Sequence, residues 1–197
     1  MTGVLILIPA AGASRRMRGR DKLMEPVGGL PLLRRVADAA VATGVPVLVT
    51  LPEGDTARRA ALDGAGVTRQ TIDGSEGMAA SIRAGVQAAQ IAGARGLVVM
   101  LADMPEIDTA MLTTLIAAFA AEPAAVHRAA AADGTPGNPV VIPARLFPAL
   151  HGVTGDAGAR QVVAREAARL CPLPGRAALT DLDTPEDWAE WRSRTGY

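Results

Sequence analysis

A cluster of small and cationic side chains follows the first apolar run of the chain, and this combination suits an anion. Leu5–Ile8 leads into Pro9–Ser14, which is mostly alanine and glycine, and five cationic side chains follow within Arg15–Lys22. Small side chains let backbone N–H groups approach an anion, and the cations can neutralise several phosphate charges. The spacing is neither that of a Walker A loop nor that of the fingerprint G-x-G-x-x-G. The segment predicts another kind of polyphosphate site, and the alternative is a surface loop with solvated arginines.

A single carboxylate closes a second apolar run. Val98–Leu101 is followed by Ala102 and Asp103. An aspartate at the carboxyl end of a buried strand is well placed to hold Mg²⁺, which favours one or two carboxylates with phosphate oxygens and water. Because the first apolar run would end near the same crevice, we favour a metal site at Asp103 over a role as the cap of the next turn.

Two glycine-containing segments add backbone and charged groups. Glu76–Gly85 puts small residues at the start of an expected helix, where the backbone can approach a ligand and the helix N-terminus favours negative charge. An ordinary alanine-rich helix is the alternative. In Gly155–Arg160, Asp156 and Arg160 offer a carboxylate and a cation to a ligand, and the alternative is an N-cap with an i,i+4 pair.

Strand-like and helix-like segments alternate over most of the chain and would position these residues. Almost wholly apolar runs predict strands at Val4–Ile8, Val45–Leu51, Val67–Ile72 and Gly96–Leu101. Alanine-rich stretches with helical spacing predict helices at Leu32–Thr43, Thr56–Ala65, Met78–Ala92 and Thr109–Ala121. Strands this apolar need burial on both faces, so we expect an α/β fold, a mostly parallel sheet with helices on each side and ligands at the carboxyl ends of its strands.

The last third of the chain is less regular. After a turn-rich Asp133–Pro139, the short apolar run Val140–Ile142 predicts an antiparallel edge, and a helix is expected near Gly158–Ala168. Thr184 and Pro185, followed by two acidic residues, predict the start of a last helix. With 197 residues and no convincing linker or repeat, we expect one domain spanning residues 1–197.

Composition narrows the class of ligand. Twenty basic and twenty acidic residues give a formal net charge of zero, and aromatic residues make up only 3% of the chain. Neither feature favours nucleic acid or an anionic membrane, so a small molecule is the better expectation. Cys171 is the only cysteine, which excludes an internal disulfide framework and agrees with a cytoplasmic protein. No segment predicts export or a membrane span.

In order, these motifs resemble those of the molybdenum-cofactor nucleotidyltransferases, which include the molybdopterin guanylyl- and cytidylyltransferases. The resemblance extends from Val4 to about Trp188. It rests on Ala10-Ala11-Gly12-x-Ser14-x-Arg16-Met17 with Lys22, Glu76–Gly85, Ala102-Asp103-Met104-Pro105, Gly137-Asn138-Pro139, Gly155–Arg160 and Asp181–Asp187. The chain differs from the family pattern by an extra residue within Arg18–Asp21 and by Ala102, where the family has glycine.

The resemblance implies a three-layer, Rossmann-like nucleotidyltransferase that moves a nucleoside monophosphate from an NTP to a phosphate acceptor and releases pyrophosphate. The implied catalytic residues are Arg16, Lys22 and Asp103. The implied nucleotide-binding residues are Ala10, Ala11, Gly12, Ser14, Lys22, Gly77 and Ser81. The acceptor side would contain Asn138, Asp156 and Arg160, and Mg²⁺ would bind Asp103 and Asp156. Asp181–Asp187 is expected to act only through its helix-capping chemistry.

The resemblance also bears on both substrates. Cytidylyl members carry Ala-Ala-Gly where guanylyl members carry Ala-Gly-Gly, and a methyl group at Ala11 would narrow the pocket toward a pyrimidine, so we predict CTP over GTP. Molybdopterin is the implied acceptor, and a molybdoenzyme is a possible partner. A guanylyl- or sugar-phosphate nucleotidyltransferase and a noncatalytic partner that delivers cofactor to a molybdoenzyme remain alternatives.

Overall fold

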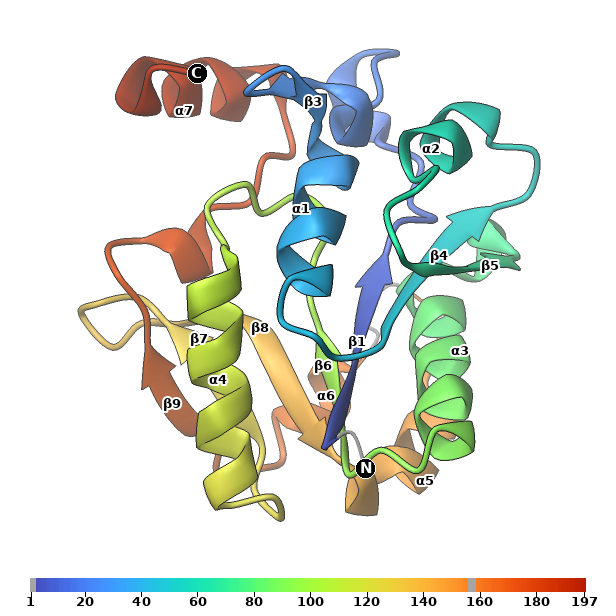
Figure 1. Cartoon of the computed structure of the whole chain (residues 1–197), viewed down its shortest axis with the longest axis vertical. Coiled ribbons are helices and arrows are strands. Elements are labelled where there is room, and N and C mark those ends of the chain that lie inside the picture. Colours follow the sequence, from blue (N-terminus) through green and yellow to red (C-terminus); the bar gives the residue numbers. More distant parts are fainter. Residues whose placement is uncertain (1–2, 156–158) are drawn as a thin grey trace.

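A seven-stranded sheet forms the centre of the protein, whose computed structural model describes residues 3–155 and 159–197 (Figure 1). The spatial order of its strands is β5 (Thr68–Ile72), β4 (Val47–Pro52), β1 (Val4–Pro9), β6 (Gly96–Val99), β8 (Pro136–Pro143), β7 (His127–Ala130) and β9 (Arg169–Pro172). Strands β5, β4, β1 and β6 are parallel. The prediction of a mostly parallel α/β sheet is confirmed.

Helices cover both faces of this sheet because its central strands are apolar on both sides. Val4, Ile6 and Ile8 of β1 pack in one core cluster with the helices α1 (Leu32–Val41) and α4 (Thr109–Ala121). Leu5 and Leu7 of the same strand pack in a second cluster with α3 (Met78–Ile91) and α5 (Phe147–His151). Alternate side chains of a strand point to opposite faces, so one apolar strand fills both clusters and produces three layers.

The antiparallel pairing lies on the β8 side of the sheet, as expected, but not at its outermost strand. β8 runs antiparallel to both β6 and β7, whereas β9 pairs parallel with β7 at the edge. Strand β8 also begins earlier than predicted, because Pro136–Pro139 joins the strand and does not form part of the preceding turn. Its register pairs Val140 with Val99, which carries Asn138 to the edge where β6 ends.

The remaining elements are short, except for the last helix. They are the hairpin β2 (Pro26–Val27) and β3 (Leu30–Pro31), α2 (Thr56–Ala61), α6 (Arg160–Val163) and α7 (Pro185–Thr195), with 3-10 turns between. The expected helix near Gly158–Ala168 is thus only four residues long where it is described. Thr184 caps α7 in a capping box with Asp187, as its sequence predicts. No helix among the described residues combines the length and the apolar character that crossing a membrane requires.

The parallel strands all present their carboxyl ends at one edge of the sheet. At this edge the loop after β1 and the segment leading into α7 lie close to the connection that follows β6 (Figure 1). Leu182 N–H donates to the Asp103 carbonyl oxygen at 3.1 Å, which fixes the C-terminal segment beside the end of β6. Three segments that are distant in sequence therefore meet at the carboxyl ends of the parallel strands, where the ligands are expected to bind.

Candidate active site

The loop after β1 leaves a row of backbone donors open. Among the described residues, no acceptor bonds to the N–H groups of residues 11–14. Ser14 and Arg18 adopt positive φ values of 47° and 52° on either side of the 3-10 turn Arg15–Met17. Gly12 and Ala13 are exposed. Successive unpaired N–H groups in a turned backbone form an anion-binding concavity, as the small side chains of this loop predict.

Lys22 joins this loop to two carboxylates. Its Nζ lies 2.5 Å from Asp103 Oδ2 and 2.7 Å from Asp183 Oδ1. Arg16 Nη1 lies 2.8 Å from the other oxygen of Asp183. The side chains of Lys22 and Asp103 are only 17% and 14% exposed, so these charges are partly withdrawn from water. The structure thus brings together the three residues predicted to be catalytic, and the extra residue before Lys22 does not prevent its reach.

Negative charge is concentrated around this lysine. Burial alone would lower the pKa of Lys22, but the carboxylates of Asp103 and Asp183 raise it above its usual value. Burial and repulsion by Asp103 and Asp183 raise the pKa of a third carboxyl group, that of Asp181. Because three carboxyl groups gather near Lys22 and Arg16, the site favours the arrival of a further cation.

The expected nucleotide-binding residues near α3 occupy two different environments. Gly77 precedes α3 with φ 65°, a conformation that favours glycine, and is half-buried. Ser81 is 2% exposed, and its hydroxyl accepts a hydrogen bond from Thr50 Oγ1 at 2.9 Å inside the protein. The Gly77 backbone is therefore partly accessible to a ligand, whereas the Ser81 side chain lies in the interior.

The loop after β1 also packs against the segment before α3. Ala10 and Ala11 are buried, and Ala10 N–H donates to the Thr50 carbonyl oxygen of β4 at 3.0 Å. A Cβ atom at Gly74 would lie 3.1 Å from the Ala11 carbonyl oxygen, so the absence of a side chain at Gly74 permits this close approach. The loop after β1 is thus in contact with the turn that leads into the predicted nucleotide segment Glu76–Gly85.

The expected acceptor residues are more dispersed. Asn138 is half-buried in β8 at the carboxyl edge of the sheet. Arg160 is exposed at the start of α6, and among the described residues no hydrogen bond or ion pair joins it to Lys22, Arg16 or Asp103. Asp156 lies outside the described residues. The Gly155 carbonyl oxygen accepts from Ala79 N–H at 3.1 Å, which brings this segment to the start of α3.

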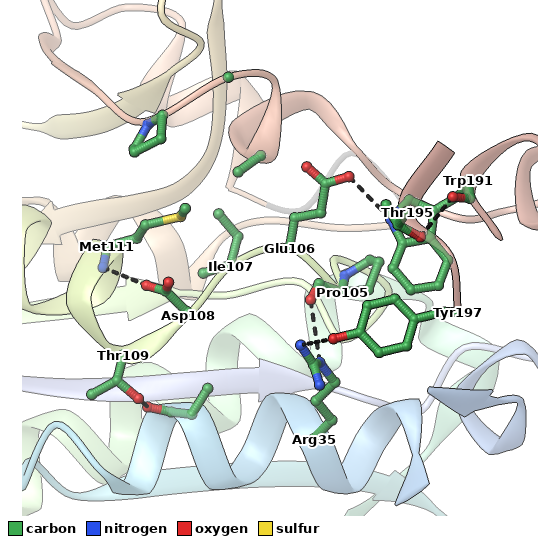
Figure 2. Close-up of a pocket in the computed structure, with 14 residues that line it drawn as sticks. Arg35, Pro105, Glu106, Ile107, Asp108, Thr109, Met111, Trp191, Thr195 and Tyr197 are labelled. Carbon is green, nitrogen blue, oxygen red and sulfur yellow. Dashed lines mark hydrogen bonds between the residues drawn. The ribbon is translucent and has the colours of Figure 1, made fainter. Parts of the chain in front are cut away.

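A cavity of about 570 Å³ lies near α7, away from the loop after β1 (Figure 2). Its charged side chains already have hydrogen-bond partners within the protein. Arg35 donates to the Tyr197 hydroxyl at 3.1 Å, and Glu106 accepts from Trp191 Nε1 at 3.0 Å. Lys22, Asp103 and Asp183 do not line this cavity. The residues predicted to be catalytic therefore lie at the polar edge of the sheet and do not line this cavity.

Comparison with known proteins identifies the family of the chain. A family model described as the MobA-like NTP transferase domain matches residues 6–170. The chain belongs to this family. The match covers the loop after β1, Asp103 and the start of α6, and it ends before Asp183.

Three relatives align along almost the whole chain. The purine catabolism protein PucB of Bacillus subtilis is 29% identical, and the alignment covers 91% of each chain. A molybdenum cofactor guanylyltransferase of Cereibacter sphaeroides is 31% identical over 95% of this chain and 94% of the relative. Rv0371C from Mycobacterium tuberculosis, solved in complex with manganese, is 27% identical with a TM-score of 0.77, covering 96% of this chain and 97% of the other.

The donor set of the MobA-like site fits a divalent cation. Asp103 Oδ1 is buried and has no hydrogen-bond partner among the described residues. A buried carboxylate oxygen without a partner is costly, and a metal ion would satisfy it. Residues 3–155 and 159–197 contain no cluster of three or more His, Cys, Asp or Glu suited to a metal. A cation here would therefore need substrate phosphate oxygens and water in addition to Asp103, as Mg²⁺ favours.

Two residues of this site were missed in the sequence. Asp183 was expected to belong to a capping segment only, yet its carboxylate contacts both Lys22 and Arg16. Arg58 has no predicted role and falls within the expected helix Thr56–Ala65, yet it is 4% exposed and bonds to the loop after β1. Asp183 could have been found, because it is a carboxylate directly before the predicted start of the last helix at Thr184 and Pro185. A single arginine in a short alanine-rich helix offered no such signal for Arg58.

Proposed function

We propose that this nucleotidyltransferase transfers CMP from CTP to a phosphorylated acceptor, molybdopterin, with Mg²⁺ as its cofactor. The observation that carries the proposal is the position of Lys22, between Asp103 and Asp183 and at the end of the loop in which the N–H groups of residues 11–14 have no acceptor among the described residues. This arrangement offers donors for a triphosphate and a carboxylate for its counterion at the edge where α/β folds bind ligands.

The chain's own groups would act mainly by positioning. The acceptor phosphate is already an anion, so its attack on the α-phosphorus of the NTP requires little help from a general base. The open N–H groups of residues 11–14 would hold triphosphate oxygens, and Lys22 and Arg16 would neutralise charge that develops on the leaving pyrophosphate. Lys22 has three N–H donors and gives two of them to carboxylates, so it can exchange the Asp183 contact for a phosphate oxygen.

Asp103 is the residue that would hold the metal ion. Bound Mg²⁺ supplies charge neutralisation at phosphate oxygens in reactions of this class. The unpartnered Oδ1 of Asp103 supports this role, and so does the manganese in the structure of Rv0371C. Mg²⁺ is proposed over other divalent ions because a single carboxylate with phosphate and water matches its usual ligand set.

Ala11 is the basis for CTP as the donor. Its side chain is nearly buried, and its carbonyl oxygen is packed toward Gly74, so the loop has little room to retreat from a larger base. One methyl group in a closely packed site is enough to change specificity. GTP is the second candidate because several relatives, including that of Cereibacter sphaeroides, are named guanylyltransferases.

Molybdopterin as the acceptor rests on relatives that are named for the molybdenum cofactor. One relative is named for purine catabolism and not for the molybdenum cofactor, so a sugar phosphate is kept as the alternative acceptor on this scaffold. A noncatalytic binding partner is the less favoured alternative, because such a protein would not need to retain both Lys22 and the unpartnered oxygen of Asp103.

Pyrophosphate release tests the proposal. The protein is incubated with CTP or GTP and Mg²⁺, with and without molybdopterin, alongside the variants Asp103→Asn and Asp63→Asn. Asp63 is the control because its side chain is 70% exposed and pairs only with Arg69 among the described residues. We expect release that requires molybdopterin, is faster with CTP, and falls about 100-fold or more in Asp103→Asn only.

Other outcomes would revise the assignment step by step. A higher kcat/KM with GTP would replace the donor, and release with a sugar phosphate alone would replace the acceptor. Binding of CTP without pyrophosphate release with any acceptor would favour the noncatalytic partner. Full activity in Asp103→Asn would remove Asp103 from the catalytic residues.

A further inference from the structure

Arg58 is a buried cation that lies outside every motif of the sequence. It belongs to α2, the helix after β4, and its side chain is 4% exposed. Its Nη1 donates to the carbonyl oxygens of Ala10 and Gly12 at 2.7 and 2.8 Å. Its Nε and Nη2 donate to the two oxygens of Asp21 at 2.7 and 2.8 Å, and Nη2 also reaches Ser14 Oγ at 3.4 Å.

These contacts use all the donors of the guanidinium group. An arginine side chain has five N–H groups, and Arg58 directs one from Nε, two from Nη1 and two from Nη2 to partners within the protein. Nε also lies 3.2 Å from Asp55. Arg58 therefore has no donor left for a substrate, so any effect that it has on a ligand must pass through the loop.

The two carbonyl contacts determine where the loop's backbone donors point. In a planar trans peptide the C=O and N–H bonds are antiparallel. Because the carbonyl groups of Ala10 and Gly12 point at Arg58, the N–H groups in the same peptides, those of Ala11 and Ala13, point away from it. Both N–H groups lack an acceptor among the described residues, and Ala13 is exposed.

The contact between Arg58 and Asp21 also helps to fix the position of Lys22, the next residue in the chain. Asp21 Oδ1 accepts from Ser14 Oγ at 3.0 Å and from Leu23 N–H at 3.0 Å, and so starts the 3-10 turn Lys22–Met24. Burial alone would raise the pKa of Asp21, but the hydrogen bond and the charge of Arg58 hold it below the usual value. Arg58 is thus bonded to both ends of the loop that contains the open N–H groups and leads to Lys22.

We infer that Arg58 is a positioning residue that holds residues 10–22 in their phosphate-binding conformation, so that the N–H groups of Ala11 and Ala13 face the triphosphate of the nucleotide. The inference rests on the proposed function, because it assigns those N–H groups to the triphosphate. The proposed role depends on the shape of the Arg58 side chain and not only on its charge. A planar guanidinium fork can bond two carbonyls and one carboxylate together, whereas a lysine ammonium is a point charge.

The test compares Arg58→Gln and Arg58→Lys with the matched control Arg59→Gln. Arg59 is the next residue of the same helix but is exposed and bonds to Thr71 at the surface. Binding of CTP, GTP and inorganic tripolyphosphate is measured by calorimetry, and KM and kcat are measured for nucleotide and acceptor separately. Far-UV circular dichroism and Tm report on folding.

We expect both Arg58 variants to bind tripolyphosphate and nucleotide about 10- to 100-fold more weakly, because the loop donors would be misplaced. KM for the nucleotide should rise while KM for the acceptor stays within about twofold, a split that general destabilisation would not produce. Arg58→Lys should lose nearly as much affinity as Arg58→Gln although it keeps the charge. Arg59→Gln should match the wild type.

Two results would overturn the inference and leave the proposed function intact. One is wild-type affinity for tripolyphosphate and nucleotide in Arg58→Lys or Arg58→Gln. The other is loss of the native circular dichroism spectrum in both variants, which would make Arg58 a residue of the fold as a whole. A wild-type protein that binds neither nucleotide nor tripolyphosphate would instead overturn the proposed function together with the inference.

Discussion

The loop after β1 and the start of β8 lie at the same edge of the sheet, but different forces hold them. In the loop, the Arg58 guanidinium bonds to carbonyl oxygens and to Asp21. At the start of β8, Gly137 packs so closely on the backbone of Ala178 that a Cβ atom would lie 1.9 Å from the Ala178 carbonyl oxygen. Charge and hydrogen bonds hold the first region, and close packing holds the second.

This difference suits the two substrates in the proposed reaction. Ion pairs can be exchanged for others, so Lys22 and Arg16 can leave Asp183 when phosphate oxygens arrive. The backbone around Gly137 cannot exchange its contacts in the same way, because protein interiors are packed as densely as crystals of small organic molecules. The nucleotide side is therefore expected to respond to anions and to pH, whereas the β8 side offers a fixed surface beside Asn138.

The largest expected effect comes from Gly137→Ala on the packed side. The new methyl group would meet a backbone atom that cannot rotate away, so we expect a loss of about 3 kcal/mol or more in the free energy of unfolding. Urea denaturation measures it. The control is Gly152→Ala, where the nearest atom lies 3.8 Å from the added carbon. A change in Gly137→Ala as small as that in the control would mean that β8 and its neighbours are not closely packed.

On the charged side, the corresponding change is Lys22→Gln. It removes a cation from the triphosphate site and leaves Asp103 and Asp183 without their shared partner. We expect kcat/KM to fall about 100-fold, or about 2.7 kcal/mol, as when one donor to a charged transition state is lost. Arg169→Gln is the control, because Arg169 lies on the edge strand β9, its side chain is 58% exposed and it pairs with Glu122. Equal kinetics in both variants would contradict the role of Lys22.

The sequence predicts the charged side better than the packed side. Lys22 and Asp103 are 81 residues apart, yet each follows an apolar strand, and parallel strands end at the same edge. Asp183 is 161 residues from Lys22, and no periodicity relates them. Arg58 was not predictable, because its role depends on which loop α2 packs against and its composition is that of any short helix.

The packed side was predicted less well because its composition is misleading. Pro136, Gly137 and Pro139 are typical of turns, so Asp133–Pro139 was expected to be one. Pairing with β7 and packing on Ala178 instead draw Pro136–Pro139 into β8. Tertiary contacts of this kind override local preference, and a single sequence does not contain them.

A smaller loss of stability is expected for Asp21→Asn, and its pH dependence should distinguish the loop after β1 from the start of β8. Asp21→Asn weakens the bond to Arg58, and we expect a loss of about 1.5 kcal/mol at neutral pH. The pKa of Asp21 is lowered from 3.8 by Arg58 in the folded protein, so the stabilisation is present above pH 3.8 and disappears as the pH falls through the folded value. Urea denaturation between about pH 7 and pH 3 measures the difference between variant and wild type.

The comparison with Gly137→Ala sharpens this test. Close packing involves no titrating group, so its stability difference from the wild type should stay constant over the same pH range. A difference for Asp21→Asn that also stays constant down to the lowest pH would show that the Asp21 charge does not hold the loop. The two regions would then not differ in the way that their contacts indicate.

The smallest effect is expected for the ion pair between Arg18 and Glu186, which joins the same loop to α7. Its side chains are 74% and 64% exposed, so water and salt screen the pair. We expect Arg18→Ala to change the free energy of unfolding by no more than about 0.5 kcal/mol, measured by urea denaturation at low and high salt. A loss above about 1 kcal/mol that disappears in high salt would mean that α7 also holds the loop. Arg58 of α2 is buried, whereas Arg18 is exposed. If Arg18→Ala changes the free energy of unfolding only slightly, the conformation of the loop depends on its contacts with α2 and not on those with α7.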